Sequence, residues 1–500
     1  MILRPSIQNI KVVGYYLGKI IMGLSVFTAI PLVFAFFARE INPQTDFTIS
    51  LCFTIMLGLL LEILCKTERE PNWMEGMIVV CLSWLAAMFL GAIPLFLSGH
   101  WKSYLDACFE AMSGFATTGL TLVNDLDHLS MSHNLWRHLI MFMGGQGIII
   151  VALSFLVQGF SGAFRMYVGE ARDEKVLPNV VSTSRFIWLV SVTYLVLGTL
   201  ALGIVGTLEG MRPFNAFFHG ACIFMAGFDT GGFAPQSQNI LYYHSFPFEV
   251  VTISIMVLGA INFKLHYAVW TGNRKEIMRN IETVTFFITI MTTFLIVAWG
   301  LVADGTYPGV ISVFRKGFYQ LISGHTGTGF MTIYAMQFVK EWGALALAGI
   351  IIAMGLGGAA CSTTGGIKMV RIGIACKALI QDIKRIMVPE SAVVVSKFHH
   401  IKSIVLEDKQ VRSVLIILLS YLILYGLGGL MGMALGYPFW ESLFESTSAA
   451  ANVGLSCGIT QPSMPALLKW TYIVQMWVGR LEFMSVFTLI GFFVSAIKGK

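Results

Sequence analysis

The chain has 500 residues, of which 56% are hydrophobic and 12% are charged, and its formal net charge is +6. Because soluble domains carry about 25% charged residues, this composition excludes an ordinary soluble protein and indicates a chain embedded in a bilayer. Basic inner loops account for the small positive charge, so we expect no nucleic acid partner.

Apolar runs recur along the whole sequence and predict one integral membrane domain with ten spanning segments. The first run is too long for the apolar part of a signal peptide and has no A-x-A-like cleavage site at its end, so we expect it to remain as a helix. The predicted spans are residues 16–38, 49–65, 75–97, 135–160, 186–207, 246–270, 284–303, 343–388, 412–435 and 466–495.

Four less apolar stretches of about half a span lie between these segments, at 104–123, 212–233, 309–330 and 440–455. Their lengths suit re-entrant segments. An N-terminus inside the cell places most basic residues in inner connections, as the positive-inside rule requires. These residues are Arg165, Arg172, Lys175, Arg185, Arg274, Lys275, Arg279 and the basic stretch from Lys368 to Arg412.

One short motif recurs in all four half-length stretches. Its copies read SGFATTGL from residue 113, AGFDTGGF from 226, SGHTGTGF from 323 and SAAANVGL from 448. Each copy has glycine at the seventh place, which predicts a fourfold internal repeat of span, half-helix, glycine bend and span. We therefore predict an all-α polytopic membrane protein with two N-terminal helices at 1–70 and four pore units at 71–165, 180–280, 281–395 and 405–500.

Bends inside the hydrocarbon need a reason, because unsatisfied backbone groups there cost several kcal/mol each. Around one axis, four such bends present carbonyl oxygens that can replace the hydration shell of a cation, and each half-helix aims its partly negative C-terminal end at the same place. The alternative is a set of glycines for close helix packing. We predict a cation selectivity filter made of Thr117, Thr118, Gly119, Thr230, Gly231, Gly232, Gly327, Thr328, Gly329, Asn452, Val453 and Gly454.

The repeat resembles the Trk-type potassium uptake proteins of the Trk/Ktr/HKT superfamily over about residues 75 to 500. The two additional N-terminal helices are like those of the TrkH and TrkG branch. The resemblance implies four helix, pore-loop, helix units around a pseudo-fourfold axis, in a multi-pass protein of the bacterial inner membrane that takes up potassium. In the superfamily a serine at the first aligned glycine often accompanies sodium preference, so Gly119 favours potassium.

The segment GGAACSTTGGIKMVR, residues 357–371, interrupts the inner helix of the third unit. Its glycines and small polar residues weaken a helix and allow alternative backbone paths. The resemblance implies an intramembrane loop that obstructs ions until it moves; a seam of small residues for helix packing is the alternative. The predicted gating residues are Gly357, Gly358, Ser362, Thr363, Thr364, Gly365, Gly366, Lys368 and Arg480.

Arg480, in VGRLEF, is predicted to lie inside the last long helix, about 20 Å from its start at a rise of 1.5 Å per residue. A charge at that depth must face water or a partner. The resemblance implies that Arg480 faces the cavity below the filter, repels cations and helps to latch the gating loop. The alternative is an ion pair with a carboxylate on another helix, for which Glu482 is poorly placed.

Five other polar residues stand out near the motif copies and the predicted gating loop. We expect Glu110 and Glu445 to brace their half-helices, and Asp229 to concentrate cations as an outer carboxylate. His325 and Cys361 depart from the aromatic and the glycine that are common in the family. Asp229 and His325 could alter ion preference or pH response, and Cys361 could stiffen the gating loop.

The sequence has no CxxC pair, HExxH motif, GxSxG elbow or GK[ST] phosphate loop, so we do not expect an enzyme. Ion gradients and membrane potential must then supply the energy. The resemblance implies a homodimer surrounded by membrane lipid and bound by a TrkA-like cytoplasmic nucleotide-binding subunit, with 368–412 as the docking surface. The alternatives are a mixed potassium and sodium or cation-coupled transporter and the KdpA-type potassium-binding subunit of a P-type pump.

Overall fold

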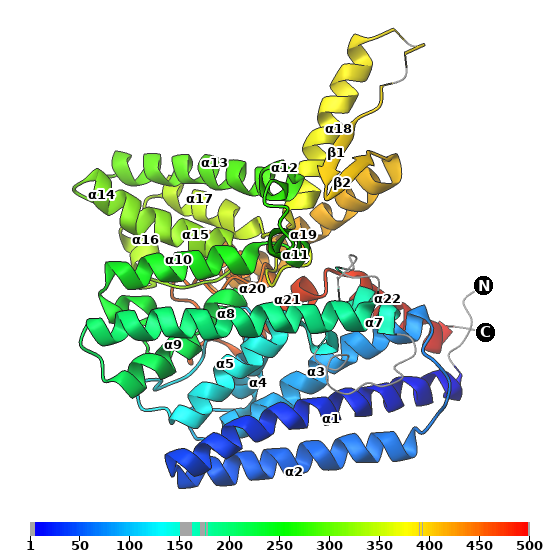
Figure 1. Ribbon diagram of the computed structural model, residues 1–500, viewed down its shortest axis with the longest axis vertical. Coiled ribbons are helices and arrows are strands. Elements are labelled where there is room, and N and C mark those ends of the chain that lie inside the picture. The colour runs from blue at the N-terminus through cyan, green and yellow to red at the C-terminus, as the bar shows by residue number, and fades with distance from the viewer. Residues whose placement is uncertain are drawn as a thin grey trace.

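The computed structural model describes residues 6–150, 163–170, 176, 179–389, 391–392 and 394–498. Long helices run side by side through the molecule, and α1 begins at the same end at which α22 finishes (Figure 1). The prediction of an all-α polytopic protein is confirmed, apart from one short β hairpin. The predicted inner residues Arg172 and Lys175 lie outside the described residues.

Among the described residues, six helices are long and apolar enough to cross a membrane, and each contains most of a predicted span. Apolar residues cover nearly their whole circumference, as is typical of helices between lipid and protein. They are α1 (Ile7–Ala38), α2 (Ile41–Leu64), α3 (Trp73–Leu97), α8 (Val180–Leu208), α13 (Ile281–Ala303) and α19 (Asp408–Ala434).

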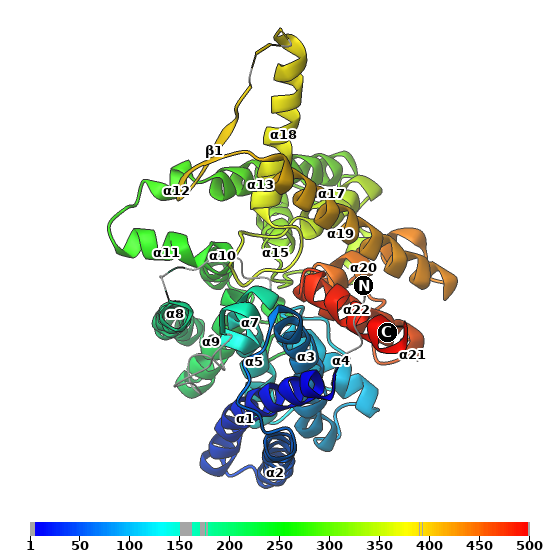
Figure 2. The same cartoon turned by 90° about the vertical axis from the view of Figure 1, so that its right-hand side faces the viewer.

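Helices α1 and α2 form an antiparallel pair at one edge of the bundle (Figure 2). The pair is close because Gly18 and Gly58 leave room: a Cβ at Gly18 would lie 2.9 Å from the carbonyl oxygen of Gly58. Glu40, between the two helices, accepts hydrogen bonds of 2.9 Å from the backbone N–H of Met131 and 3.0 Å from that of Ser132. This carboxylate caps α5 (Met131–Gln146) and fixes the pair to the first predicted pore unit.

Short helices occupy the four half-length stretches, as predicted, and each ends at its copy of the motif. Local signals start them: Ser103 caps the first helix through the N–H of Asp106, and Pro213 opens the second. The helices are α4 (Tyr104–Phe115), α9 (Pro213–Phe228), α15 (Tyr319–His325), preceded by α14 (Val310–Ser312) and the π-helical η2 (Val313–Phe318), and α20 (Phe439–Ala450).

Two predicted spans are broken, which corrects their description as single helices. Residues 246–270 form α10 (Phe246–Ala260) and α11 (Phe263–Trp270), bent by 102°. Residues 466–495 form α21 (Ala466–Arg480) and α22 (Met484–Lys498), bent by 112°. The predicted span 135–160 is also interrupted, because α5 ends at Gln146, and the predicted interruption at 357–371 separates α17 (Ala344–Gly355) from α18 (Met369–Met387).

Each break has a local cause. Asn262 leaves the helical conformation and its side chain caps α11 through the N–H of Lys264. Glu482 and Phe483 have φ of 50° and 75°, which no helix accommodates. The carbonyls freed by such breaks need donors, and hydroxyls of α19 supply two, from Tyr421 to Gly479 at 2.9 Å and from Tyr425 to Gly355 at 3.2 Å.

Helix α18 and the hairpin of β1 (Lys397–His400) and β2 (Lys402–Val405) project from the bundle (Figures 1 and 2). The sequence analysis did not predict the hairpin. Its His399 bonds to Glu276 at 3.0 Å, which holds it against the connection before α13. The remaining short elements are α7 (Ala163–Gly169), η1 (Asn239–Tyr243), α12 (Glu276–Arg279) and α16 (Gln337–Lys340).

Candidate functional site

The backbone bends in the four motif copies share one conformation. The fifth and seventh residues have positive φ, and the sixth has negative φ. Strain of this kind costs on the order of 1 kcal/mol or more for a threonine or asparagine and typically gathers at functional sites. The fifth-place values are 51° at Thr117, 52° at Thr230, 71° at Gly327 and 55° at Asn452, and the seventh-place values are 92° at Gly119, 71° at Gly232, 83° at Gly329 and 94° at Gly454.

The backbone N–H groups of the bends turn back to the preceding helices. The sixth-place donors reach the first-place carbonyl at 2.7 Å in the first copy, 2.8 Å in the second and 2.9 Å in the third and fourth. Among the described residues, the sixth-place carbonyl oxygens accept no hydrogen bond, although these residues are almost fully buried. The N–H groups of the bends are therefore satisfied within their own motif copies, whereas the sixth-place carbonyl oxygens are available to bind a ligand. These oxygens belong to Thr118, Gly231, Thr328 and Val453.

The seventh-place glycines bring the four bends together in a ring. A Cβ added to Gly119 would lie 2.1 Å from the carbonyl oxygen of Gly231, so the first and second bends are in direct contact. Each further bend contacts the next in the same way. The distances are 2.1 Å from Gly232 to Thr328, 2.1 Å from Gly329 to Val453 and 2.0 Å from Gly454 to Thr118. The fourth bend thus returns to the first. Only glycine fits at these places, because real Cβ atoms essentially never approach another atom within 3.0 Å.

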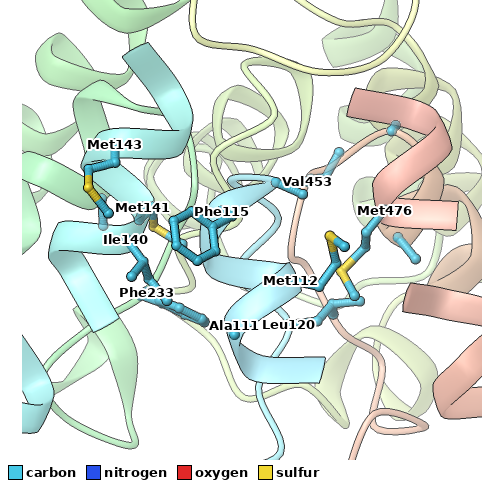
Figure 3. Packing of buried hydrophobic residues seen from close by; sticks show 14 of the residues in the cluster. Ala111, Met112, Phe115, Leu120, Ile140, Met141, Met143, Phe233, Val453 and Met476 are labelled. Carbon is cyan, nitrogen blue, oxygen red and sulfur yellow. The ribbon is translucent and has the colours of Figure 1, made fainter. Parts of the chain in front are cut away.

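A cavity opens on one side of the ring, and all four seventh-place glycines line it. Arg137 also lines this cavity and stacks over Phe233, with 4.2 Å from its guanidinium carbon to the ring centre. Behind the ring, apolar side chains from α4, α5 and α21 pack closely, among them Met112, Phe115 and Met476 (Figure 3). The ring therefore borders a cavity on one face and is held by a dense apolar wall.

Glu110 braces the first bend, as predicted. Its buried carboxylate accepts from the Thr121 hydroxyl at 2.9 Å and from the Leu122 N–H at 3.0 Å. It also pairs with Arg137 at 2.7 Å. A buried charge pair with further hydrogen bonds fixes its partners in one geometry, so Glu110 locks the chain that leaves the ring to the start of the next helix.

Glu445 does the same for the fourth bend, also as predicted. Its carboxylate accepts from the Ser456 hydroxyl at 2.5 Å, from the Thr460 hydroxyl at 2.7 Å and from the Cys457 N–H at 3.0 Å. At the equivalent place of the third bend, Gln320 donates to the Thr332 hydroxyl at 3.0 Å. Three of the four bends thus have a polar brace nine residues before the seventh-place glycine.

On the other side of the ring, the segment between α17 and α18 lies directly against the bends. The hydroxyl of Thr363 donates 2.9 Å hydrogen bonds to the carbonyls of Phe228 and Gly259, and it lies 3.3 Å from the Thr230 hydroxyl. A Cβ at Gly365 would meet the fourth bend, 2.7 Å from the Cβ of Asn452. Thr363 and Gly365, two of the predicted gating residues, are therefore packed against the bends on this side of the ring.

Arg480 is the last residue of α21, and its cation lies at the partly negative end of that helix. One guanidinium nitrogen donates to the Thr363 carbonyl at 2.6 Å and to the Thr117 hydroxyl at 3.2 Å. Another donates to the carbonyl oxygens of Gly144 at 2.6 Å and Gly145 at 3.3 Å. One side chain thus joins the segment under the ring, the first bend and the end of α5.

Sequence reasoning missed Glu482 as a functional residue. The sequence analysis considered it only as a poor partner for Arg480, and its carboxylate bonds to Arg371 and lies 3.8 Å from the ammonium of Lys368. Glu282 was missed as well, and its carboxylate accepts a 2.6 Å hydrogen bond from the N–H of Ala360. For Glu482 the available signal was a carboxylate inside the predicted span 466–495, since a buried charge in a membrane needs a partner.

Asp229 is not an outer carboxylate, which corrects that prediction. It caps the C-terminal end of α9, is fully buried and accepts a 2.7 Å hydrogen bond from Gln146, on the Arg480 side of the ring. His325 points to α13, 2.9 Å from the Thr289 hydroxyl, and not into the ring. Cys361 has φ of 50°, the left-handed region that favours the glycine it replaces.

Comparison with known proteins decides the family. Residues 43–494 match the TrkH family, described as a cation transport protein. The chain belongs to this family of cation transport proteins. It is 31% identical to an uncharacterized cation transporter of Methanocaldococcus jannaschii over 98% of this chain and 97% of the relative. It is also 27% identical to the Trk system potassium uptake protein TrkG of Escherichia coli, over 97% of this chain and 99% of that one.

A solved structure also has the same fold. The potassium transporter TrkH of Vibrio parahaemolyticus matches with a TM-score of 0.80 at 23% identity, over 96% of this chain and 98% of that one. With its apolar helices, this TrkH family member is a multi-pass protein of the inner membrane. Transport, and not catalysis, is the activity of the family it belongs to.

Proposed function

We propose that the ring is a potassium selectivity filter and that the chain takes up potassium through it. The closed contact of four bends carries this proposal, because it gathers sixth-place carbonyl oxygens that no donor of the described residues occupies. Such oxygens can replace the water around a cation. The names of the relatives, which describe potassium uptake, support potassium as the ion.

In this proposal the four pore units surround the ring, and residues 357–368 form a gate beneath it. Arg480 holds the gate through the Thr363 carbonyl and repels cations by its charge. The strain at Thr117, Thr230 and Asn452 supports the proposal, since backbone strain of this kind typically gathers at functional sites. Movement of the gate would open the axis on the side of the ring opposite the cavity.

The experiment is cation flux into liposomes that hold the purified protein, under an imposed inside-negative potential. Potassium, rubidium, sodium and lithium are compared in the same preparation. The proposal predicts that potassium and rubidium enter well ahead of sodium and lithium. Equal entry of sodium would contradict potassium selectivity and indicate a mixed potassium and sodium pathway. Flux that stops when a proton or sodium gradient is removed would instead indicate coupled transport.

We further propose a TrkA-like regulatory subunit on the inner face and a homodimer. Relatives named as parts of Trk systems support a partner. Helix α18 offers exposed basic residues outside the bundle, at Lys377, Lys384 and Arg385. Size-exclusion chromatography with light scattering tests the dimer, and binding of a purified TrkA-like subunit to Lys377→Glu and Lys384→Glu variants tests the docking surface.

A further inference from the structure

A groove lies among α3, α7, α18, α19 and the start of α22, and its residues Lys409, Arg412, Ile416 and Ile417 belong to neither the ring nor the gate proposed above. We call it the inner groove, and Arg371, Lys409, Arg412, Ile416, Ile417 and Met484 are the lining residues that matter here. Its open volume is about 1200 Å³. The basic stretch from Lys368 to Arg412, which the positive-inside rule assigns to the cytoplasmic side, contributes Arg371, Lys409 and Arg412 to its lining.

Two cations stand at the mouth of the inner groove. Lys409 and Arg412 lie in the first two turns of α19, three residues apart and so on one face, and both are exposed. Within the part of the chain that the structure describes, neither forms an ion pair or a side-chain hydrogen bond. Arg371 and Glu482 also line the groove, but they bind each other, so the free positive charge at the mouth comes from Lys409 and Arg412. The mouth is therefore suited to an anion.

The groove becomes apolar beyond these cations. Ile416 follows Arg412 by one turn of α19 and is 53% exposed, and Met484 of α22 faces it and is 58% exposed. Seven residues separate Lys409 from Ile416, which is about 10 Å along the helix. Exposed apolar side chains at this depth belong to the edge of the hydrocarbon. The groove thus has a cationic end at the bilayer surface and an apolar end inside it.

We propose that the inner groove binds an anionic phospholipid of the inner leaflet. The phosphate would lie between Lys409 and Arg412, and an acyl chain would lie along Ile416 and Met484. Basic pockets between membrane helices on the cytoplasmic side bind anionic lipid head groups in this way. A free phosphate satisfies only the cationic end, and an acidic protein segment would leave the apolar end uncovered.

The test is native mass spectrometry of the full-length protein in detergent, titrated with phosphatidylglycerol or phosphatidylcholine. The double variant Lys409→Gln/Arg412→Gln is compared with the double variant Lys377→Gln/Lys384→Gln. The second variant also loses two positive charges, but from exposed residues of α18. We expect the first pair to weaken phosphatidylglycerol binding by about thirtyfold, the scale of two cations near a membrane surface. The α18 pair and phosphatidylcholine binding should change by less than about twofold on the same grounds.

Ile416→Trp keeps both cations and fills the apolar end of the groove, so it should also displace phosphatidylglycerol. Equal binding by the two charge variants, or equal affinity for both lipids, would overturn the proposal. Full displacement of the lipid by inorganic phosphate would also overturn it, because the site would then recognise a free anion. None of these readings depends on ion flux, so the lipid site and the proposed filter are tested separately.

Discussion

The guanidinium of Arg480 donates a 2.6 Å hydrogen bond to the main-chain carbonyl oxygen of Thr363, and the Thr363 hydroxyl donates to the Phe228 carbonyl just before the second bend. A single residue of the segment under the ring is therefore held from both sides. The bond from Arg480 uses a backbone carbonyl and so depends on the position of the segment, whereas the bond to Phe228 depends on the Thr363 side chain. The arrangement links the end of α21 to the ring.

Arg480→Ala should raise potassium flux. The substitution removes the bonds to Thr363 and Gly144, and the loss of even one hydrogen bond from a charged group, worth about 1.5 kcal/mol, would raise the open fraction by about tenfold. The rate of potassium entry into liposomes measures the flux of the variant and of the parent protein. Arg385→Ala, an exposed arginine of α18, is the matched control. Unchanged flux in a folded Arg480→Ala protein would contradict the proposed latch.

Glu482→Gln should loosen the same segment from below. The change leaves Arg371 and Lys368 without their carboxylate, and breaking a buried pair costs more than about 1.4 kcal/mol, or about tenfold in an opening equilibrium. Hydrogen exchange of residues 357–367 reports the opening directly. Asp382→Asn removes a surface pair with Arg385 and should leave that exchange unchanged. Equal exchange in both variants would show that Glu482 does not hold the segment.

Gly329→Ala should lower the preference for potassium over sodium. A Cβ would lie 2.1 Å from the Val453 carbonyl oxygen, so that oxygen must move out of the ring. We expect a loss of about tenfold in the flux ratio, or about 1.4 kcal/mol of discrimination. Gly426→Ala, where a Cβ meets nothing within 4 Å, is the control. An unchanged ratio would exclude Gly329 from the filter.

Glu445→Gln should destabilise the protein. The amide places an N–H₂ group among donors from Cys457, Ser456 and Thr460, and unsatisfied buried donors cost about 1 to 3 kcal/mol each. Thermal unfolding of the purified protein in detergent measures the change. Glu68→Gln, at an exposed loop position, should unfold like the parent. If both variants unfold at the same midpoint temperature as the parent protein, Glu445 does not stabilise the fourth bend.

The ring was predictable because its signal is local and repeated. Four motif copies with a glycine at the same place predict four bends, and half-length apolar stretches predict the short helices before them. The braces at Glu110 and Glu445 followed from their fixed distance to the glycines. Each of these features depends on residues near one another in the sequence.

Other features depend on contacts that the sequence does not display. The breaks after Ala260 and Arg480 occur within continuous apolar runs, so composition alone predicted single spans. The outer position expected for Asp229 was wrong because the direction of its side chain is set by Gln146, far away in the sequence. Glu482 binds Arg371, which lies more than one hundred residues earlier in the chain, and no local spacing rule predicts a contact at that separation.

Direct observation of bound ions tests the central claim, that four bends make one cation filter. The measurement is cryo-electron microscopy or anomalous diffraction of the protein in rubidium and in sodium. The account predicts rubidium on the axis of the ring, coordinated by the carbonyl oxygens of Thr118, Gly231, Thr328 and Val453, and a weaker signal in sodium. A well-ordered ring with no ion on its axis in rubidium would contradict the account, because the four glycines would then serve only to pack the bends together.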